Sequence, residues 1–499
     1  MRQLEIHQIQ EIEILIKKNE KVRAVKKIRE ILSTTNFENY RLDLSNLCRR
    51  SGNPLMGLKL LRGKIFSETK IPSPAEVISY SASLYQVGCH FEANEKLHEV
   101  FQRFQDLNDQ DKQDVVFHLG LLEMSRWNYH KASRYFQQAL KLKSLSEYRR
   151  NLCVLNLASC YSFYGKFFKA INLFKKIIDT TDESNFSLLH LSALEGLAQC
   201  YFYQSKYDDA IQLLQSQIIS DNISIEMMRL KKWYCLAQLK KQTNSILYLE
   251  QMKKLRQINL VQFYFEEVRD CDFYIGLFEN NMNDLTKIYF GTQFSGFKKK
   301  ILYHLPQFQP NESWHHDLDL VGIEEQRKDR SFLSIDLDFY KKLTNLQRKL
   351  LYCLMRDFYR PISMGEIYSF VYDHAYFDPM TTPDRIRRSI YNLNKTLKQL
   401  HIPFYIKSYS GFYILTATIG CRLMMQKKSL ISFSQFEKMK KDQIFKVNQW
   451  RSCQEISEQQ GWSRSKTQRW LKSLLDKRQI ISSGSFKDRK YKGKSLRST

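Results

Sequence analysis

Apolar positions in the first 290 residues recur at helical spacing, and the pattern itself repeats at longer intervals. Three stretches show it best: 118–140, 155–177 and 195–217. In each, a small residue is followed twelve positions later by Ala, and four positions after that by a large apolar residue. A Gly, Asn or Ser lies between the two helical halves. Because small residues let two helices approach closely, each stretch predicts a helix–turn–helix hairpin.

These positions form a ladder along the chain. The small and Ala pairs are Gly120 with Ala132, Ala158 with Ala170 and Ala198 with Ala210; the large residues are Phe136, Phe174 and Leu214; the turn residues are Asn128, Gly165 and Ser205. Fainter copies are marked by Ala24, Gly57 and Ala93 and by the stretches 227–253 and 265–290. Successive rungs lie 33 to 40 residues apart, which predicts about eight hairpins. One such hairpin cannot bury its apolar face alone, so the hairpins are expected to stack.

The repeating unit resembles the tetratricopeptide repeat (TPR), a helical hairpin of about 34 residues. The resemblance covers residues 1–290, where three copies match well. It implies an α-solenoid whose concave face binds a peptide or protein partner. The alternative is an array that only spaces or dimerises the rest of the chain, so a monomer and a homodimer both stay open.

Residues 291–330 break the helical pattern with Pro306, Pro310 and mixed charge, which predicts a linker with one short helix. Within it, the stretch 314–319 holds two adjacent histidines and two aspartates. Adjacent histidines without a third ligand at helical spacing are poor evidence for a metal centre. A solvated loop is the favoured interpretation, and we expect no bound metal.

Residues 331–418 change to a mixed pattern of strands and short helices. The expected elements are a strand over Phe332–Phe339, helices over Leu343–Phe358, Met364–Val371 and Asp384–Leu400, and a ribbon of Phe404–Ile406 and Gly411–Leu415 around the residues 407–410. Either Thr344 or Asn345 can cap the first helix. Thr382 can cap the third, where Pro383 suits the first turn. The expected buried positions are Leu346, Leu350 and Leu354 in the first helix and Ile386, Ile390, Leu393, Leu397 and Leu400 in the third.

A strand, three helices and a ribbon make a winged helix, and this segment resembles the effector domain of OmpR/PhoB-type response regulators. The resemblance rests on Leu343-Thr344, Pro361-Ile362-Ser363, the apolar positions Ile390, Leu393 and Leu397, and the wing residues Tyr405-Ile406 and Gly411–Leu415. In that family the third helix enters the DNA major groove. The resemblance therefore implies base-reading roles for Arg385, Arg388, Ser389 and Asn392, and phosphate contacts for Lys395 and Lys407. A merely solvated arginine face is the alternative.

The segment also departs from that family. Asn392 and Asn394 stand where the family often has Arg. The receiver domain that usually accompanies the effector domain is missing, because its alternating strands and helices cannot be fitted to the helical residues 1–290. Aspartyl phosphorylation is therefore not the expected input.

A second small domain is expected over residues 430–499. Ser452 and Glu455 form a capping box for a helix over Cys453–Gln460, and Ser463 caps a helix over Arg464–Lys477. A hairpin of Gln479–Ser483 and Phe486–Lys492 follows, with Ser483-Gly484-Ser485 at its tip.

This second domain resembles the generic bacterial winged helix-turn-helix. The resemblance implies base reading by Arg464, Ser465, Gln468 and Arg469, and phosphate or wing contacts by Lys466, Lys487, Arg489, Lys490 and Lys492. Use of the domain for protein contact is the alternative, which so basic a wing disfavours.

Charge supports an anionic partner for the last third of the chain. Lys and Arg total 78 against 52 Asp and Glu, a net charge of +26. Residues 331–499 hold 32 basic and 13 acidic residues, whereas residues 1–330 hold 46 and 39. A uniform lysine bias would not concentrate the excess in this way. The sequence therefore favours double-stranded DNA as a partner of the C-terminal third.

Several function classes find no support. The chain lacks the common nucleotide-binding, zinc-protease, serine-hydrolase and dinucleotide motifs, so we expect no enzyme and no cofactor. Its ten cysteines include no C-x-x-C pair, which favours buried thiols in a reducing cytoplasm. No run of 18 apolar residues predicts a membrane helix, and Met1–Lys17 lacks the pattern of a secretory signal.

Taken together, the sequence predicts a mainly α fold: an α-solenoid of TPR-like hairpins at 1–290, a linker at 291–330, and two small α+β winged-helix domains at 331–418 and 430–499. The favoured function is a cytoplasmic, nucleoid-associated bacterial transcriptional regulator that reads DNA. The alternative is a TPR interaction scaffold that binds nucleic acid non-specifically or binds an acidic partner.

Overall fold

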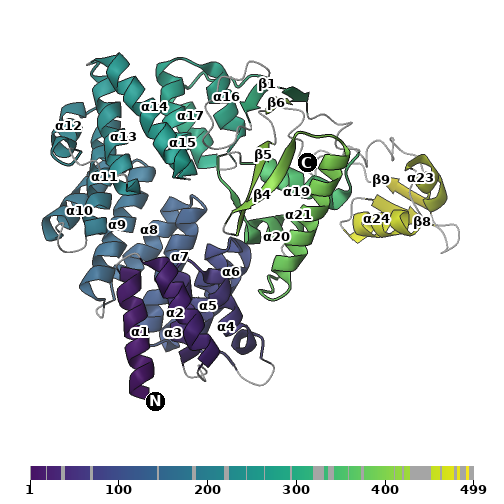
Figure 1. The fold of residues 1–499 in the computed structure, drawn as a ribbon, viewed down its shortest axis with the longest axis horizontal. Coiled ribbons are helices and arrows are strands. Elements are labelled where there is room, and N and C mark those ends of the chain that lie inside the picture. The colour runs from purple at the N-terminus through teal and green to yellow at the C-terminus, as the bar shows by residue number, and fades with distance from the viewer. Residues whose placement is uncertain are drawn as a thin grey trace. The chain divides into compact units, whose positions relative to one another are not determined.

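The computed structural model describes residues 2–493 except for 18–19, 35–39, 68–70, 143–144, 182–186, 219–223, 243, 263, 293–294, 318–330, 335–341, 358, 373–375, 410, 418–420, 427–450, 461–463, 477–479 and 484–489. The chain divides into two compact units, residues 1–425 and 426–499. The first contains the helical repeats and the first small domain (Figure 1). The second contains the other small domain.

The described part of residues 2–290 forms sixteen α-helices that pair into eight hairpins, the number the ladder predicts. The hairpins are α1 (Arg2–Lys17) with α2 (Lys21–Thr34), α3 (Arg41–Arg50) with α4 (Pro54–Ile65), α5 (Pro74–Gln86) with α6 (His90–Phe101), α7 (Asp109–Ser125) with α8 (Tyr129–Leu140), α9 (Glu147–Phe163) with α10 (Phe167–Thr180), α11 (Ser187–Tyr203) with α12 (Tyr207–Gln215), α13 (Ile225–Lys240) with α14 (Ser245–Val261), and α15 (Phe265–Phe278) with α16 (Met282–Phe290). A short 3₁₀ turn, η2 (Phe104–Asp106), precedes α7. The predicted α-solenoid of TPR-like hairpins is confirmed.

Small residues bring the helices together, as the ladder predicts. The ladder residues on the second helices are all buried: Ala24, Gly57, Ala93, Ala132, Ala170 and Ala210. A Cβ added at Gly120 would lie 2.8 Å from the ring of Phe136, four residues after Ala132. In the next hairpins, a Cβ at Gly196 of α11 would lie 2.5 Å from Cε1 of Phe174 in α10. Large rings on second helices therefore fill the space left by glycine on neighbouring first helices.

Most of the described turns between paired helices use one residue in the left-handed region, and the turn between α13 and α14 uses two, Gln242 (φ 58°) and Asn244 (φ 47°). Gly165 (φ 83°) and Ser205 (φ 59°) take this conformation at the positions expected from the sequence. In the hairpin of α7 and α8, Asn128 lies between the two helices as expected, and the preceding residue, Trp127 (φ 62°), takes the left-handed conformation. Such a backbone is costly for a large residue, and the indole packs against α17 (Ser295–His304), where a Cβ at Gly296 would lie 3.1 Å from its Cζ3.

Residues 291–330, expected to be a linker, add structure to the array. Helix α17 buries Phe297 and Ile301 in the same core as α13 and α15. The two histidines lie in strand β1 (Ser313–Asp317) instead of the expected loop. This strand joins a three-stranded sheet of order β1-β6-β2, in which β2 (Ser331–Ser334) runs parallel to β6 (Cys421–Gln426). Pairing in this sheet satisfies the backbone N–H and C=O groups of the strands. The local sequence pattern does not reveal this pairing.

The first small domain has the element order of a winged helix. Its elements are α19 (Asn345–Met355), β3 (Ile362–Ser363), α20 (Met364–Val371), α21 (Thr382–Gln399), β4 (Phe404–Tyr409) and β5 (Phe412–Ala417). The strands form an antiparallel sheet of order β3-β5-β4. Thr344 caps α19 in a capping box with Gln347, and Ser363 caps α20 with Glu366.

Three details of that domain differ from expectation. Leu346 is 38% exposed, so the first-helix stripe runs through Leu350 and Leu354 without it. Thr382 does not cap α21; its hydroxyl instead accepts a hydrogen bond from the Asp378 N–H at 3.0 Å. The ribbon is longer than predicted, so Lys407 lies within β4, paired with Ile414.

The second unit contains β7 (Arg451–Ser452), α23 (Cys453–Gln460), α24 (Arg464–Asp476), β8 (Ile480–Ser483) and β9 (Lys490–Gly493). Its sheet order is β7-β9-β8, with Ser483 paired to Lys490. The predicted tip at 483–485 is therefore wrong in register, and residues 484–489 lie between the paired strands. None of the helices among the described residues is long and apolar enough to cross a membrane.

Candidate nucleic-acid interface

Helix α21 owes its orientation to a clean division between an apolar and a polar face. Ile386, Ile390, Leu393 and Leu397 are buried, as predicted, and Leu400 directly after the helix is half-buried. On the α19 side, the Gln347 amide donates to the Thr396 hydroxyl at 2.7 Å. The helix is thus fixed by one face, and its opposite face is available to a partner.

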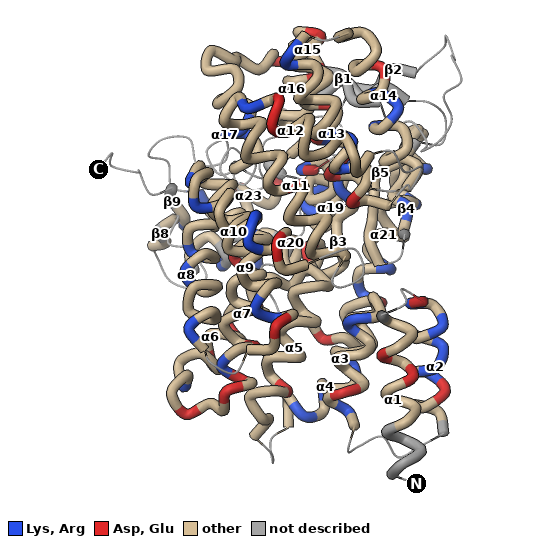
Figure 2. Tube along the Cα trace, turned by 90° about the vertical axis from the view of Figure 1, so that its left-hand side faces the viewer, with Lys and Arg blue, Asp and Glu red and all other residues tan. Residues whose placement is uncertain are grey.

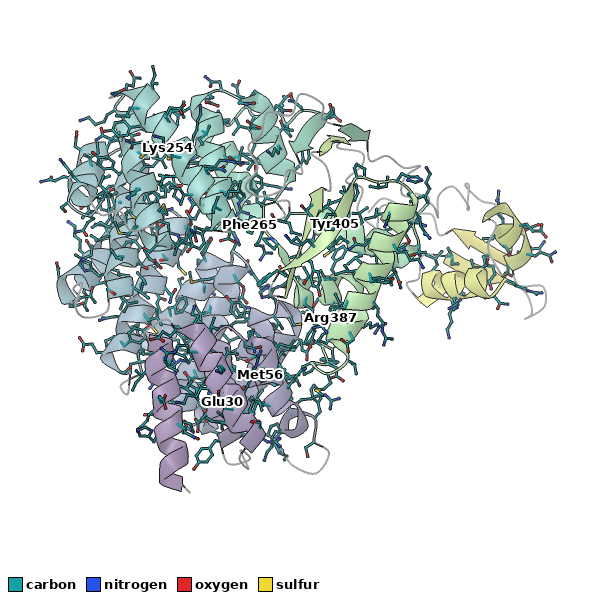
Figure 3. The ribbon with its side chains drawn as sticks, viewed as in Figure 1. Glu30, Met56, Lys254, Phe265, Arg387 and Tyr405 are labelled. Carbon is teal, nitrogen blue, oxygen red and sulfur yellow. The ribbon has the colours of Figure 1, made fainter. Side chains whose placement is uncertain are left out.

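The sequence-predicted contact residues lie on that opposite face. Arg385, Arg388, Asn392 and Lys395 are exposed, and Ser389 is half-buried at its edge. Tyr391, which the sequence prediction missed, is 68% exposed between Arg388 and Lys395 on the same face. The spacing of three and four residues from those two neighbours would have identified it. Arg387 belongs to the same polar surface but forms an ion pair with Asp384 at 2.7 Å (Figure 3).

Arg385 is held within the domain by an aromatic ring. Its guanidinium carbon lies 3.9 Å from the ring centroid of Tyr372, at the end of α20. The Tyr372 and Ser389 hydroxyls are 3.0 Å apart, and the Ser389 hydroxyl donates to the Arg385 carbonyl at 2.9 Å. Arg385 and Ser389 therefore form an ordered edge of the face. Arg388, Tyr391 and Lys395 occupy its centre.

The wing is attached to α21 through Asn394. Its side-chain amide donates to the Ile406 carbonyl at 2.9 Å and accepts from the Ile406 N–H at 2.8 Å. This pair of hydrogen bonds fixes β4 against the helix, so the departure from arginine at this position has a structural reason. Lys407 is the next residue along β4 and is exposed. The turn at Gly411 (φ 84°) then returns the chain into β5.

The second unit presents a similar helix face. Ile456, Leu471, Leu474, Ile480 and Tyr491 form its core, and Thr467 is also buried. The capping box of α23 is confirmed, since Ser452 and Glu455 exchange hydrogen bonds of 2.7 and 3.2 Å. These bonds to Ser452 lower the pKa of the Glu455 carboxyl. The short core holds α24 by its inner side.

On the outer side of α24, Arg464, Gln468 and Arg469 are exposed, and Lys490 is exposed on β9. The remaining predicted contacts fall outside what the structure describes: the side chains of Ser465, Lys466 and Lys492, and the whole of Lys487 and Arg489. The same geometry, a helix with a polar outer face beside a basic strand, thus occurs once in each unit.

Charge on the array is uneven. The helix pair α1 and α2 carries both acidic and basic positions (Figure 2). Residues 126–180, in contrast, hold eleven Lys and Arg against two Asp and Glu. Among the residues the structure describes, no group of three His, Cys, Asp or Glu could hold a metal ion.

Comparisons with known proteins return structural similarity alone. No protein family matches the sequence, and neither does any curated protein. Among solved structures, a Rap protein complexed with competence and sporulation factor is 11% identical, with a TM-score of 0.40, over 81% of this chain and 94% of that one. A tetratricopeptide repeat protein from Parabacteroides merdae is 16% identical, with a TM-score of 0.35, over 50% and 92%. A TPR protein fragment from Cytophaga hutchinsonii is 15% identical, with a TM-score of 0.30, over 60% and 96%.

Proposed function

We propose that the chain is a DNA-binding transcriptional regulator, in which α21 and α24 read double-stranded DNA. The carrying observation is the exposed face of α21. Arg388, Asn392 and Lys395 are exposed on a helix whose other side is fully packed. Arg and Asn are the residues that pair bidentately with guanine and adenine in the major groove, each worth about 1–3 kcal/mol of discrimination.

The wings and the charge distribution support the same proposal. Lys407 on β4 and Lys490 on β9 are exposed beside their helices, where DNA phosphates are contacted in winged-helix complexes. The net excess of 19 basic residues in 331–499, from 32 basic and 13 acidic, suits a polyanion. Tyr391 adds a flat apolar group that can pack on a thymine methyl or a sugar.

In this proposal the array binds a peptide or protein partner, and that partner regulates DNA binding by the two small domains. Stacked helical hairpins of this type offer extended binding surfaces. Recruitment through the array and dimerisation of the chain are both compatible with the proposal. A scaffold that uses its basic surfaces for non-specific nucleic-acid or acidic-partner binding is the competing function.

The test is selection of bound sequences from random duplex DNA by the full chain. A second arm uses a variant with Arg385, Arg388, Arg464 and Arg469 changed to Ala. A matched control changes Arg134, Lys169, Lys175 and Lys176, four exposed positions on α8 and α10, to Ala. Both variants lose four positive charges, so only the location of the charges differs.

We expect an enriched motif with the native chain and the control, and loss of the motif with the first variant. The spacing of half-sites then tells whether one or both units engage. Salt-sensitive binding that is equal for all sequences, with an affinity that both variants lower to the same extent, would contradict base reading. The scaffold would then be the remaining function.

A further inference from the structure

The winged-helix domain of the first unit makes specific, partly buried contacts with the array. The first is between backbones: the Gly365 N–H of α20 donates to the Val87 carbonyl at 2.8 Å, in the turn between α5 and α6. A Cβ at Gly365 would lie 2.6 Å from Sγ and 2.8 Å from N of Cys89. On the other side, Gly88 (φ 93°) packs directly on Ser363, the cap of α20. Only glycines allow this approach.

The second contact involves the loop between α20 and α21. Phe377 is 1% exposed, and its N–H donates to Glu92 Oε2 of α6 at 2.8 Å. The neighbouring Asp378 accepts two hydrogen bonds from Arg62 of α4, at 2.8 and 2.9 Å. A bidentate arginine–carboxylate pair fixes orientation as well as distance. Figure 1 shows α20 beside α6.

The third contact is at the other end of the array. Tyr359, between α19 and β3, is buried in the core formed by α13, α15 and α17. Asp357 is also buried and interacts electrostatically with Arg269 of α15. Arg360 pairs with Glu366 at 2.6 Å, directly beside His90 of α6. The domain therefore touches both the third hairpin and the eighth.

We propose that the turn 87–89, together with Arg62 and Glu92, is a latch that holds the winged-helix domain in one orientation and so couples the array's curvature to α21. A repeat array bends by small rotations at each hairpin. A domain attached to both the third and the eighth hairpins fixes the total rotation, and so the curvature, of the array between them. A partner that changes the curvature of the array must therefore break one of the two attachments. Because coupling between two sites is reciprocal, releasing the latch must in turn alter the affinity of the array for that partner. This coupling stands whether or not α21 binds DNA.

Gly365→Ala in the full chain tests the latch. The added methyl group collides with Cys89 of the array, whereas α20 itself tolerates alanine. Gly63→Ala is the matched control, because a Cβ there meets only Arg41 Nη1, at 3.8 Å, in another array helix. The readout is amide hydrogen exchange of peptides that cover 364–381, 87–92 and 386–397.

We expect exchange in 364–381 and 87–92 to rise about tenfold or more in Gly365→Ala, with 386–397 in α21 unchanged, and no effect of Gly63→Ala. Unchanged exchange throughout would overturn the latch. Equal loss of protection in α21 would also overturn it, because the contacts would then be part of one inseparable folding unit.

A charge-swap pair tests the same proposal independently of steric effects. Arg62→Asp and Asp378→Arg should each raise exchange in 364–381, and the double variant Arg62→Asp/Asp378→Arg should restore protection. Failure of the double variant to restore it would show that the pair does not hold the domain.

Discussion

At the scale of single residues, two asparagines of α21 that are two positions apart have different surroundings. Asn394 is half-buried and makes both of its hydrogen bonds to Ile406, whereas the Asn392 side chain is exposed. Removing a partner from a half-buried amide pair leaves backbone groups unsatisfied, at a cost of about 1–3 kcal/mol. Losing an exposed amide costs little stability.

We therefore predict that Asn394→Ala lowers the free energy of unfolding by about 1–3 kcal/mol and raises amide exchange in β4. Asn392→Ala should leave both quantities unchanged while weakening DNA binding. Denaturation curves and exchange of the peptide 404–409 provide the measurement. Equal stability of the two variants would contradict the role of Asn394 in attaching strand β4 of the wing to α21.

The residues that sequence reasoning identified correctly are those with local periodicity. The buried stripe of α21 from Ile386 to Leu397 follows from helical spacing alone, and so do the exposed Arg388 and Lys395. Thr382 was assigned as a cap on good grounds, but its hydroxyl is used by the Asp378 N–H in a loop whose shape the array determines. Local rules cannot anticipate a competing partner of that kind.

At the scale of helices, the array depends on glycine facing aromatic rings across hairpins. Phe174 of α10 is almost completely buried against Gly196 of α11, where a Cβ would lie 2.5 Å from Cε1. A methyl group there forces either the ring or the helix to move. Overpacking of this kind costs about 1–3 kcal/mol.

Gly196→Ala should therefore destabilise the array by about 1–3 kcal/mol, even though alanine is the better helix former. Phe174→Leu on that background should recover part of the loss, because the smaller side chain vacates the space. Thermal unfolding of the single and double variants measures both effects. A neutral or stabilising Gly196→Ala would show that the two helices are not in close contact.

Element boundaries were predictable where capping and periodicity agree. The helix Met364–Val371 and the helix Cys453–Gln460 are found at the residues that the sequence predicts, and both follow a capping box. Strand β1 was not predicted, because its pairing with β6 joins segments more than 100 residues apart. The sequence also places the wing hairpin of the second unit too tightly, because Ser483 pairs with Lys490 and not with a residue close to Phe486. The register of a strand depends on the whole sheet.

At the scale of the whole molecule, the attachment of the domain to the array buries a carboxyl group. Burial raises the pKa of Glu92 to about 7, although the Phe377 N–H partly offsets this. A carboxyl group with a raised pKa binds its proton more tightly in the folded state. Folding is therefore favoured at low pH, and stability is lost as the pH rises from about 4.5 to about 7. The shift corresponds to about 3 kcal/mol.

We predict that Glu92→Gln removes this contribution, so that stability falls less between pH 5 and pH 8 than in the native chain. The neutral amide keeps an oxygen for the Phe377 N–H and carries no charge to bury. Denaturant midpoints at the two pH values give the measurement, with Glu99→Gln, exposed on the same helix, as the control. Identical pH profiles of native and Glu92→Gln chains would be inconsistent with a buried carboxyl at this interface.

Electrostatics at the same scale predict the salt response. If both wings contact phosphates, the logarithm of the DNA association constant falls linearly with the logarithm of salt concentration. Lys490→Ala should reduce that slope by about one and weaken all sequences alike. Lys254→Ala, on α14 of the array (Figure 3), should leave the slope unchanged. A slope unaffected by Lys490→Ala would place the phosphate contacts elsewhere.

The attachment itself could not have been predicted from the sequence. Gly365, Phe377 and Glu92 carry no motif, and each is compatible with an ordinary helix or loop position. Their significance comes from contacts between residues nearly 300 positions apart, such as the hydrogen bond from Phe377 to Glu92 across 285 residues. A single sequence with local periodicity contains no signal at that separation.

That separation has a consequence for the synthesis of the protein. A ribosome adds about 5–20 residues per second, so 285 residues take about 15 to 60 s. The third hairpin folds and then waits for that time with Cys89 and the neighbouring glycine turn uncovered, although Cys89 is almost completely buried in the finished molecule. Nascent chains stalled before residue 365 should therefore expose the Cys89 thiol and the Glu92 carboxyl group, both of which are buried in the finished molecule.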